Sequence, residues 1–252
     1  MTDDILTKIE DRVLTITFNR TDKKNAITAA MYQKMADAMA DANTNDDVRA
    51  ILFNANGDMF TAGNDLMDFK NNPPLTEDAS VSQFLKQLVL AEKPMVAAVN
   101  GLAVGVGFTM LLHCDIVYLS ETAQLSAPFV DLALVPEAAS SLLMPARIGH
   151  AKSAEIFMLG KRMTAAEADL HGVASNVFAP DELMPAAEKA AAMLAKRAPA
   201  AIKHTKRLMR GDKDELAARM ALESKAFGAQ LLSPELAEAV MAFTQKREPN
   251  FG

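Results

Sequence analysis

Two apolar runs constrain the fold of this chain more strongly than any other feature of its sequence. Residues 48–53 and 94–99 are almost continuously apolar, and each run is followed by a glycine-containing turn and then by a helical pattern. Strands that are buried on both faces have this near-continuous apolar character, whereas half-exposed strands alternate. The sequence therefore predicts an α/β fold in which buried strands lead repeatedly into helices.

The N-terminal region predicts a further unit of two strands and a helix. Residues 5–18 contain two β-type runs that are separated by the polar residues Glu10, Asp11 and Arg12. Thr28 then offers a side-chain oxygen that caps an amphipathic helix, which we expect to end at about Met39. This order of elements is that of a ββα unit.

Similar patterns recur further along the chain. Residues 115–119 and 123–126 look like a second strand pair, and residues 138–148 follow with helical spacing. Beyond about Pro180, alanine, leucine and charged residues repeat at helical spacing with few β-branched residues, so this part should be entirely helical. The recurrence of ββα units favours a spiral of similar turns over a simple doubly wound sheet.

Charge and cysteine content argue against several classes of protein. A formal net charge of -6 and a pI near 5.3 disfavour nucleic acid, whose phosphate backbone attracts a basic face. The single cysteine, Cys114, cannot form an internal disulfide, and the first residues lack the pattern of a signal peptide, so we expect a cytoplasmic protein. No apolar run reaches the roughly 18 residues that cross a bilayer. We expect neither a nucleic-acid nor a membrane partner.

We also expect no metal site. His113, Cys114 and Asp115 are adjacent and straddle a change from helix to strand, so they cannot present three ligands to one ion without distortion. His113 and Cys114 are instead expected to pack in the core.

Two turns carry the first chemical signal. Residues 60–66 follow a buried strand and contain Gly63, and residues 100–107 lie between a strand and an apolar helix. Backbone N–H groups at the start of such a helix lack intrahelical partners and favour an anion. Either turn alone is more often an ordinary tight connection between a strand and a helix. A dinucleotide-binding loop is disfavoured, because Met110 stands where its third glycine would be.

Taken together, the motifs resemble those of the enoyl-CoA hydratase/isomerase (crotonase) family. The resemblance rests on NRTDKKNAIT from Asn19, AGND from Ala62, PMVAAVNGLAVGVG from Pro94, HCDI from His113 and the terminal MAFTQKREPNF. It implies a crotonase-type spiral of ββα units over residues 1–195 and a helical trimerisation region over residues 196–252. It also implies an enzyme of fatty acid metabolism that forms a homotrimer or a dimer of trimers. No tightly bound cofactor is expected, since coenzyme A is part of the substrate.

The resemblance also implies an oxyanion hole and a set of substrate contacts. The backbone N–H groups of Asn64 and Val106 match the two donors to the thioester oxygen, and the β-branched side chain of Val106 predicts a narrower pocket than glycine would leave. Other positions that match contacts to the CoA thioester are Lys24, Ala26, Ala62, Gly63, Asp65, Leu66, Gly105, Phe243 and Lys246. Alternatives remain for several of these residues: a solvated charge for Lys24, a helix cap for Asp65, and helix surface for Phe243 and Lys246.

The acid–base residue distinguishes the possible reactions. Hydratases of the family use two glutamates, and the matching positions here are Thr109 and Phe129. Residues 131–141 instead resemble the loop of peroxisomal-type 3-enoyl-CoA to 2-enoyl-CoA isomerases, whose single catalytic glutamate matches Glu137. Apolar neighbours should desolvate Glu137 and raise its pKa, which makes it a better base near neutral pH. The alternative role is a carboxylate that stabilises a helix N-terminus.

A double-bond isomerase is therefore the leading hypothesis from the sequence. One carboxylate suffices to move a proton from the α carbon to the γ carbon, whereas water addition needs a further group that activates water. A 2-enoyl-CoA hydratase is the second hypothesis, and thioester hydrolysis is a weaker third. A non-catalytic acyl-CoA-binding scaffold is the alternative from another class of protein. Ala138 and Ala139 replace glycines that are usual in the isomerase loop.

Overall fold

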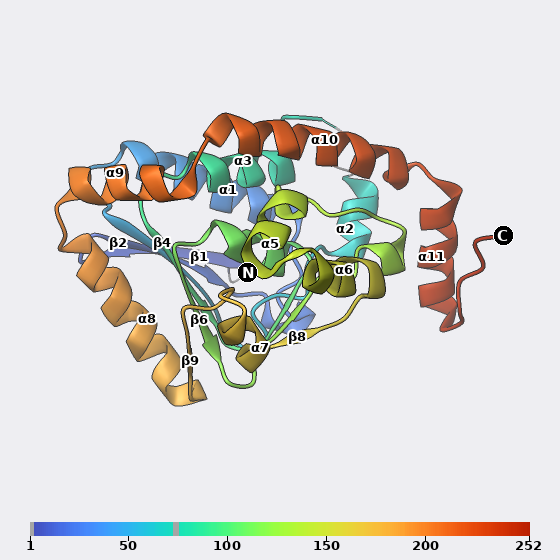
Figure 1. The fold of residues 1–252 in the computed structure, drawn as a ribbon, viewed down its shortest axis with the longest axis horizontal. Coiled ribbons are helices and arrows are strands. Elements are labelled where there is room, and N and C mark those ends of the chain that lie inside the picture. The colour runs from blue at the N-terminus through green and yellow to red at the C-terminus, as the bar shows by residue number, and fades with distance from the viewer. Residues whose placement is uncertain (1–2, 73–75) are drawn as a thin grey trace.

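The computed structural model describes residues 3–72 and 76–252 and shows an α/β architecture with two sheets (Figure 1). The larger sheet has the strand order β1-β2-β3-β4-β6-β9, and the smaller has the order β5-β7-β8. Helices cover both faces of the larger sheet, so its central strands are buried (Figure 1).

The two N-terminal strands form the expected hairpin. β1 (Ile5–Glu10) pairs with β2 (Val13–Phe18) in antiparallel fashion. The intervening Asp11 and Arg12 have φ values of 48° and 65°. Two consecutive left-handed residues give the hairpin turn whose twist matches that of the strands. The two runs predicted in residues 5–18 are thus confirmed.

The remaining strands of the larger sheet run parallel to β2. They are β3 (Ala50–Ala55), β4 (Met95–Val99), β6 (Ile116–Ser120) and β9 (Asn176–Phe178). Every residue of β4 is buried, as the continuous apolar run predicts. Successive residues of β3 contribute to two separate clusters, with Ile51 and Phe53 on one face and Ala50 and Leu52 on the other. The larger sheet therefore has a core on each side.

The first core lies under α1 (Ala29–Thr44) and α3 (Ser80–Leu90), and the second lies under α8 (Pro180–Ala195). Thr28 caps α1 as expected, since its hydroxyl accepts a hydrogen bond from the Met31 N–H. The helix runs on to Thr44, past the expected end at Met39, because Ala42 continues its buried stripe. The position of this helix end was predicted wrongly.

The smaller sheet consists of β5 (Leu102–Val104), β7 (Gln124–Ser126) and β8 (Met163–Thr164). The strands predicted at 115–119 and 123–126 exist as β6 and β7, but the prediction that they pair with each other is wrong. β6 lies between β4 and β9, whereas β7 lies between β5 and β8. A tight turn, in which the Ala123 N–H donates to the Ser120 carbonyl, sends the chain from one sheet to the other. Local patterning identifies a strand and leaves its partner undetermined.

Short helices connect these strands, and longer helices follow them. The short ones are η1 (Thr21–Lys23), α2 (Leu66–Asn71), α4 (Val106–Thr109), η2 (Met110–His113), η3 (Val130–Leu132), α5 (Ser140–Ile148), α6 (His150–Leu159) and α7 (Ala165–Leu170). After α8, the chain continues as α9 (Pro199–Arg210), α10 (Lys213–Leu231) and α11 (Pro234–Gln245). The all-helical region predicted beyond Pro180 is confirmed. Figure 1 shows α10 lying along α3 and α11 standing at one end of the molecule.

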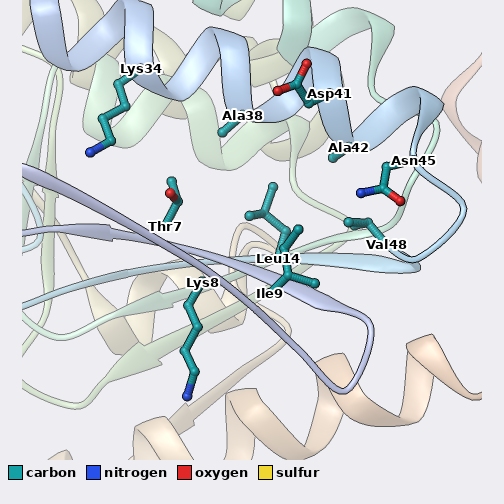
Figure 2. A pocket seen from close by; sticks show the side chains of 10 residues that line it. All are labelled: Thr7, Lys8, Ile9, Leu14, Lys34, Ala38, Asp41, Ala42, Asn45 and Val48. Carbon is teal, nitrogen blue, oxygen red and sulfur yellow. The ribbon is translucent and has the colours of Figure 1, made fainter.

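None of the helices in residues 3–72 and 76–252 is long and apolar enough to cross a membrane. A surface cavity of about 420 Å³ lies between β1 and α1 (Figure 2). Its two lysines, Lys8 and Lys34, form ion pairs with Glu10 and Asp3. None of the site residues predicted from the sequence lines this cavity.

Candidate active site

The first turn exposes the N–H group of Asn64. The Ile27 N–H donates to the Gly63 carbonyl at 2.8 Å, and the Asp65 N–H donates to the Ile27 carbonyl at 2.9 Å. Because both groups that flank Asn64 face Ile27, its own N–H points to the opposite side. Gly63 has φ +85°, and a Cβ there would lie 3.0 Å from the Val104 carbonyl oxygen. The Asn64 N–H has no acceptor among the residues that the structure describes.

The second turn exposes the N–H group of Val106 in the same way. Gly105 has φ 56° and ψ -119°, a conformation that glycine adopts readily. Its N–H donates to the Ser126 carbonyl, and its carbonyl accepts from Phe108 and Thr109 at 2.9 Å each. Val106 is the first residue of α4, so its N–H lacks an intrahelical acceptor. Within the described part of the chain this N–H donates to no other group.

A parallel bridge holds the two turns together. Thr61 pairs with Ala103, and Asn64 and Val106 each lie three residues beyond this bridge. Parallel segments leave such a bridge in the same direction, so the two unused N–H groups lie on neighbouring turns. A Cβ on Gly107 would lie only 2.3 Å from the Thr61 Cγ2 atom. Glycine at position 107 therefore sets how closely α4 approaches the first turn.

Glu137 lies against the same short helix. The hydroxyl of Thr109, which is buried in α4, donates to Glu137 Oε1 at 2.6 Å. Burial raises the pKa of Glu137 to about 7, while the hydrogen bond from Thr109 opposes this rise and the charge of Glu223 adds to it. The direction is the one that the apolar flanks of Glu137 predict. At neutral pH a large fraction of Glu137 is therefore an ionised base.

Tyr32 is a site residue that sequence reasoning missed. It is buried in α1, and its hydroxyl donates to the Asn64 side-chain oxygen at 2.5 Å. Burial and the nearby charge of Glu137 raise the pKa of Tyr32 well above its usual value, so the phenol stays neutral and can donate. Tyr32 thus fixes the side chain of Asn64 from the first long helix. Its position in the apolar stripe of α1 gave no signal, because tyrosine is common in cores.

The backbone that follows Glu137 is unusual. Ala138 and Ala139 have φ values of 61° and 54°, in the left-handed region that glycine favours. The Nε2 atom of His113 lies 2.7 Å from the Ala138 carbonyl oxygen, and the Arg210 guanidinium lies 3.1 Å from His113 Nδ1. Burial lowers the pKa of His113 to about 3, so the ring is neutral, donates from Nε2 and accepts at Nδ1. The expected core position of His113 is confirmed.

Glu223 of α10 also contacts this loop. Its carboxylate accepts hydrogen bonds from the Ala139 N–H at 2.6 Å and from the Ser141 N–H at 2.9 Å. Helix α5 begins at Ser140, so Glu223 occupies the place of a carboxylate at its N-terminus. Glu137 lies before this helix and does not fill that role. The sequence did carry a signal for Glu223, since it stands on the buried stripe of α10 that includes Leu216 and Phe227.

The predicted CoA-contact residues near the first turn lie together. Lys24 accepts at its carbonyl from the Ala62 N–H, and its exposed ammonium group pairs with Asp58 at 2.7 Å. Asp65 caps α2, because its side chain accepts hydrogen bonds from the Met67 and Asp68 N–H groups, and this confirms the predicted cap. Asp65 also forms an ion pair with Arg20 at 2.8 Å. Ala26 and Leu66 lie beside these residues in the chain: the Ala26 carbonyl accepts from Arg20, and Leu66 begins α2 with an exposed side chain.

The two predicted C-terminal contacts, Phe243 and Lys246, lie in α11 and just beyond its end. The side chain of Phe243, in α11, lies outside the part of the chain that the structure describes. Lys246 follows the end of α11 and is exposed. Helix α11 packs against η3 and α10. Among the described residues, no hydrogen bond or ion pair joins Lys246 to Glu137 or to either turn.

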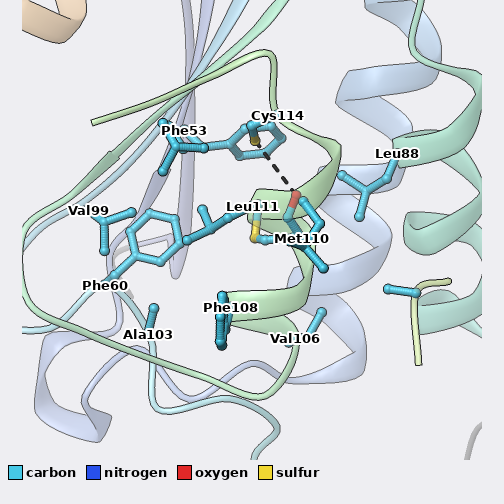
Figure 3. Packing of buried hydrophobic residues seen from close by; sticks show 14 of the residues in the cluster. Phe53, Phe60, Leu88, Val99, Ala103, Val106, Phe108, Met110, Leu111 and Cys114 are labelled. Atoms are coloured by element: carbon cyan, nitrogen blue, oxygen red, sulfur yellow. Dashed lines mark hydrogen bonds between the residues drawn. The ribbon is translucent and has the colours of Figure 1, made fainter. Parts of the chain in front are cut away.

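The side chain of Val106, which the sequence predicts to narrow the substrate pocket, lies in the core. It is 2% exposed and packs in the core that also contains Phe108 and Leu88 (Figure 3). Figure 3 also shows the contact between the Cys114 thiol and the Met110 carbonyl at 3.7 Å. Burial raises the pKa of this thiol to about 12, so it is not a nucleophile at neutral pH. The predicted core position of Cys114 is confirmed.

Neither position that corresponds to a hydratase glutamate holds a carboxylate. Thr109 instead donates to Glu137, and Phe129 is buried with its ring centroid 6.2 Å from that of Phe157. Across residues 3–72 and 76–252, no group of three His, Cys, Asp or Glu side chains is arranged to hold a metal ion. The candidate site thus contains one half-buried carboxylate and two unused backbone donors.

Known proteins share this sequence and fold. Enoyl-CoA delta isomerase 2 from Rattus norvegicus is 36% identical over 250 residues. These residues are 96% of this chain and 64% of the relative, so the chain spans less than two thirds of the length of that relative. 2,3-dehydroadipyl-CoA hydratase from Escherichia coli (strain K12) is 28% identical over 250 residues, which are 98% of each chain.

A solved structure, an enoyl-CoA hydratase/isomerase from Pseudoalteromonas atlantica T6c, is 45% identical with a TM-score of 0.96 and covers 99% of this chain and 100% of its own. This similarity confirms the expected crotonase-type fold. The family described as enoyl-CoA hydratase/isomerase matches residues 8–252. With the two turns, the bridge between them and the fold in agreement, the chain belongs to the enoyl-CoA hydratase/isomerase family.

Proposed function

We propose that the protein is an acyl-CoA isomerase that converts a 3-enoyl-CoA into the 2-enoyl-CoA. The Glu137 carboxylate removes a proton from the α carbon, and the electron pair of that C–H bond delocalises into the thioester carbonyl to give a dienolate. Protonated Glu137 then returns the proton to the γ carbon, and a double bond forms between the α and β carbons. The reaction gains and loses no atoms, so it requires neither water nor a further cofactor.

The observation that carries this proposal is the hydrogen bond of 2.6 Å from Thr109 to Glu137. It fixes the base against α4, the helix whose first N–H, that of Val106, has no acceptor among the described residues. Together with the Asn64 N–H, this group would bind the thioester oxygen as negative charge develops on it. One such donor typically contributes about 2.7 to 4 kcal/mol to transition-state stabilisation.

The raised pKa of Glu137 supports its role as a proton shuttle. A group whose pKa is about 7 both takes and returns a proton near neutral pH without a large free-energy difference between its two states. The other nearby carboxylate, Glu223, already accepts hydrogen bonds from two backbone N–H groups. A single available carboxylate favours isomerisation over water addition.

A 2-enoyl-CoA hydratase remains the second candidate, because hydratases also occur among the related proteins. Hydration requires a group that activates water in addition to Glu137. Thr109 and Phe129, which replace the two family glutamates, argue against this reaction.

We propose that the CoA part of the substrate contacts the edge formed by the first turn and the loop before α1. The residues assigned to this edge are Lys24, Ala26, Ala62, Gly63, Asp65 and Leu66, and the further residues assigned to the CoA thioester are Gly105 in the second turn and Phe243 and Lys246 in the C-terminal region. The exposed ammonium group of Lys24 suits a phosphate. No tightly bound cofactor is part of the proposal.

We further propose a cytoplasmic homotrimer or dimer of trimers. Leu208 and Met209 in α9 are 85% and 80% exposed, and Leu232 at the end of α10 is 77% exposed. Contiguous exposed apolar side chains mark subunit contacts, and the adjacent Leu208 and Met209 support this proposal. Sedimentation equilibrium gives the number of subunits, and a monomer at all accessible concentrations would contradict the proposal.

The reaction is tested by incubating the purified protein with a 3-enoyl-CoA and, separately, with a 2-enoyl-CoA. A rise in absorbance of the conjugated thioester from the first substrate supports isomerisation, and its loss from the second supports hydration. Saturable binding without turnover of either thioester would support a non-catalytic scaffold, and release of free CoA thiol would support hydrolysis. Glu137→Gln is the matched control, because it keeps the shape of the side chain and removes its basicity.

A further inference from the structure

We propose that Glu223, on the C-terminal helix α10, is a positioning residue that holds the Glu137 loop in its active conformation through hydrogen bonds to Ala139 and Ser141. This inference rests on the proposed role of Glu137 as the base. It adds a residue that lies far from the catalytic motifs in sequence and that contacts the loop rather than the substrate.

The loop needs such support because its backbone is strained. Ala138 and Ala139 are consecutive left-handed residues without the freedom of glycine. For a residue with a side chain, this conformation is less favourable than an ordinary backbone conformation. Strained conformations persist only where the surrounding structure holds them. The conformation of these two residues sets the direction from which Glu137 reaches Thr109.

The geometry of Glu223 suits this role closely. Its two oxygens accept from Ala139 N–H at 2.6 Å and Ser141 N–H at 2.9 Å, so one side chain binds both ends of the turn. Glu223 is 7% exposed and stands on an apolar stripe of α10, where an unpaired carboxylate would be strongly unfavourable. A glutamine cannot replace it, because its NH₂ group would face one of the two N–H donors.

Other groups also face the loop. His113, which accepts from Arg210, binds the Ala138 carbonyl on the opposite side of the turn. Thr109 and Tyr32 face Glu137 from α4 and α1. Arg219 of α10 lies near Glu223 and lowers the pKa of Glu223, but burial has a larger effect and raises it.

Of these groups, Glu223 combines a contact to the strained backbone with a charge that acts on the base. Its negative charge raises the pKa of Glu137, in addition to the larger effect of burial. Removal of the carboxylate should therefore change both the position of the base and its protonation. A residue that only stabilised the fold would change neither property in the folded enzyme.

The test uses Glu223→Gln in the full chain, with Glu215→Gln as the matched control on an exposed position of the same helix. We expect kcat for the 3-enoyl-CoA to fall roughly 10- to 100-fold in Glu223→Gln, as for a reacting group misplaced by about 1 Å, with KM changed less than about threefold. The acid limb of the kcat/KM profile should move to lower pH. Glu215→Gln should match the parent in all three quantities.

Two further variants test the mechanism of support. Glu223→Asp keeps the charge but is shorter, so it should keep part of the activity and the parental pH profile. Replacement of both Ala138 and Ala139 by glycine in the Glu223→Gln background should restore part of kcat, because glycine adopts the left-handed conformation without strain. If Glu223→Gln does not fold, the same comparison is made between Glu223→Asp alone and Glu223→Asp combined with glycine in place of Ala138 and Ala139.

Parental kcat and pH profile in folded Glu223→Gln would overturn the proposal, and so would a lower melting temperature with unchanged kcat. The pKa of Glu137, followed by carbon NMR of the carboxyl group and assigned with Glu137→Gln, gives a readout that needs no turnover. A lower pKa of Glu137 in Glu223→Gln is expected, and an unchanged one would contradict the inference. If the parent turns over no enoyl-CoA, the proposed function fails, while this NMR comparison still tests the coupling.

Discussion

The two turns that contain Asn64 and Val106 reach a fixed backbone conformation by different means from the loop that contains Glu137. Each turn is held by glycines and by pairing with a neighbouring segment, as in the bridge between Thr61 and Ala103. The loop has alanines in left-handed conformations and is held by His113 and Glu223, which come from other parts of the chain. Glycines within the turns therefore permit their backbone conformation, whereas the loop depends on side chains from elsewhere in the chain.

The largest expected effect comes from removal of the proposed base. Glu137→Gln should lower isomerisation at least about 100-fold, which is the low end for loss of a positioned general base, and should keep CoA-thioester binding. Turnover of a 3-enoyl-CoA and the affinity for a saturated acyl-CoA are the measurements. Turnover equal to that of the parent would show that Glu137 is not the base. The proposed functional difference between the loop and the turns would then be contradicted as well.

A second change disturbs the turns while the loop stays intact. Gly107→Ala places a Cβ at 2.3 Å from Thr61 Cγ2, so the two turns must separate, and we expect turnover to fall about 10- to 100-fold. Thr61→Ser removes that methyl group and keeps the hydroxyl, which donates to the Asn25 carbonyl at 2.6 Å. The double variant should recover most of the activity. Equal activity of Gly107→Ala and the parent would mean that the spacing of the turns is not critical.

A third change weakens the link between the turns and the loop. Thr109→Val removes the hydroxyl that donates to Glu137 and should lower turnover at pH 7 by roughly 10-fold, since a hydrogen bond to a charged group contributes about 1.5 kcal/mol or more. This hydrogen bond lowers the pKa of Glu137, so its loss should move the acid limb of kcat/KM to higher pH. Glu223→Gln should move the same limb in the opposite direction. Shifts of the same sign would contradict the assigned electrostatic roles.

The smallest effect concerns stability. The pKa of Glu137 rises from an ordinary value of 4.5 to about 7 on folding, so the folded state binds the proton more tightly. The resulting stabilisation is present below pH 4.5 and is lost as pH rises through 7. Glu137→Gln should therefore be more stable than the parent at pH 8 by about 1 to 2 kcal/mol, allowing for partial solvation. Urea unfolding at pH 5 and pH 8 measures the difference in the free energy of unfolding between Glu137→Gln and the parent. The same difference at both pH values would show that Glu137 carries no buried charge at pH 8.

Much of the fold was predictable because its signals are local. The continuous apolar runs that became β3 and β4, the cap at Thr28 and the helical spacing beyond Pro180 all act within a few residues. Strand pairing was not predictable in the same way. β6 and β7 are close in sequence, but they belong to different sheets.

The residues of the candidate site likewise divide into those with a local sequence signal and those whose partners are distant in sequence. The turns at Gly63 and Gly105 could be recognised, because a glycine in a turn indicates a backbone conformation that other residues rarely adopt. Tyr32 gave no signal, and the buried position of Glu223 gave one without identifying its contacts, since the partners of both residues lie far away in the chain. Thr109 was noticed only as the replacement for a hydratase glutamate, and its hydrogen bond to Glu137 became visible in three dimensions.

The left-handed alanines have a consequence for the population of loop conformations. A strain of roughly 2 to 4 kcal/mol in total means that a loop released from its contacts would occupy the observed conformation only about 3% to 0.1% of the time. Glycines at Ala138 and Ala139 would make the same equilibrium nearly even. The alanines thus make the observed conformation depend on the contacts that α10 makes with the loop, and its population should follow those contacts.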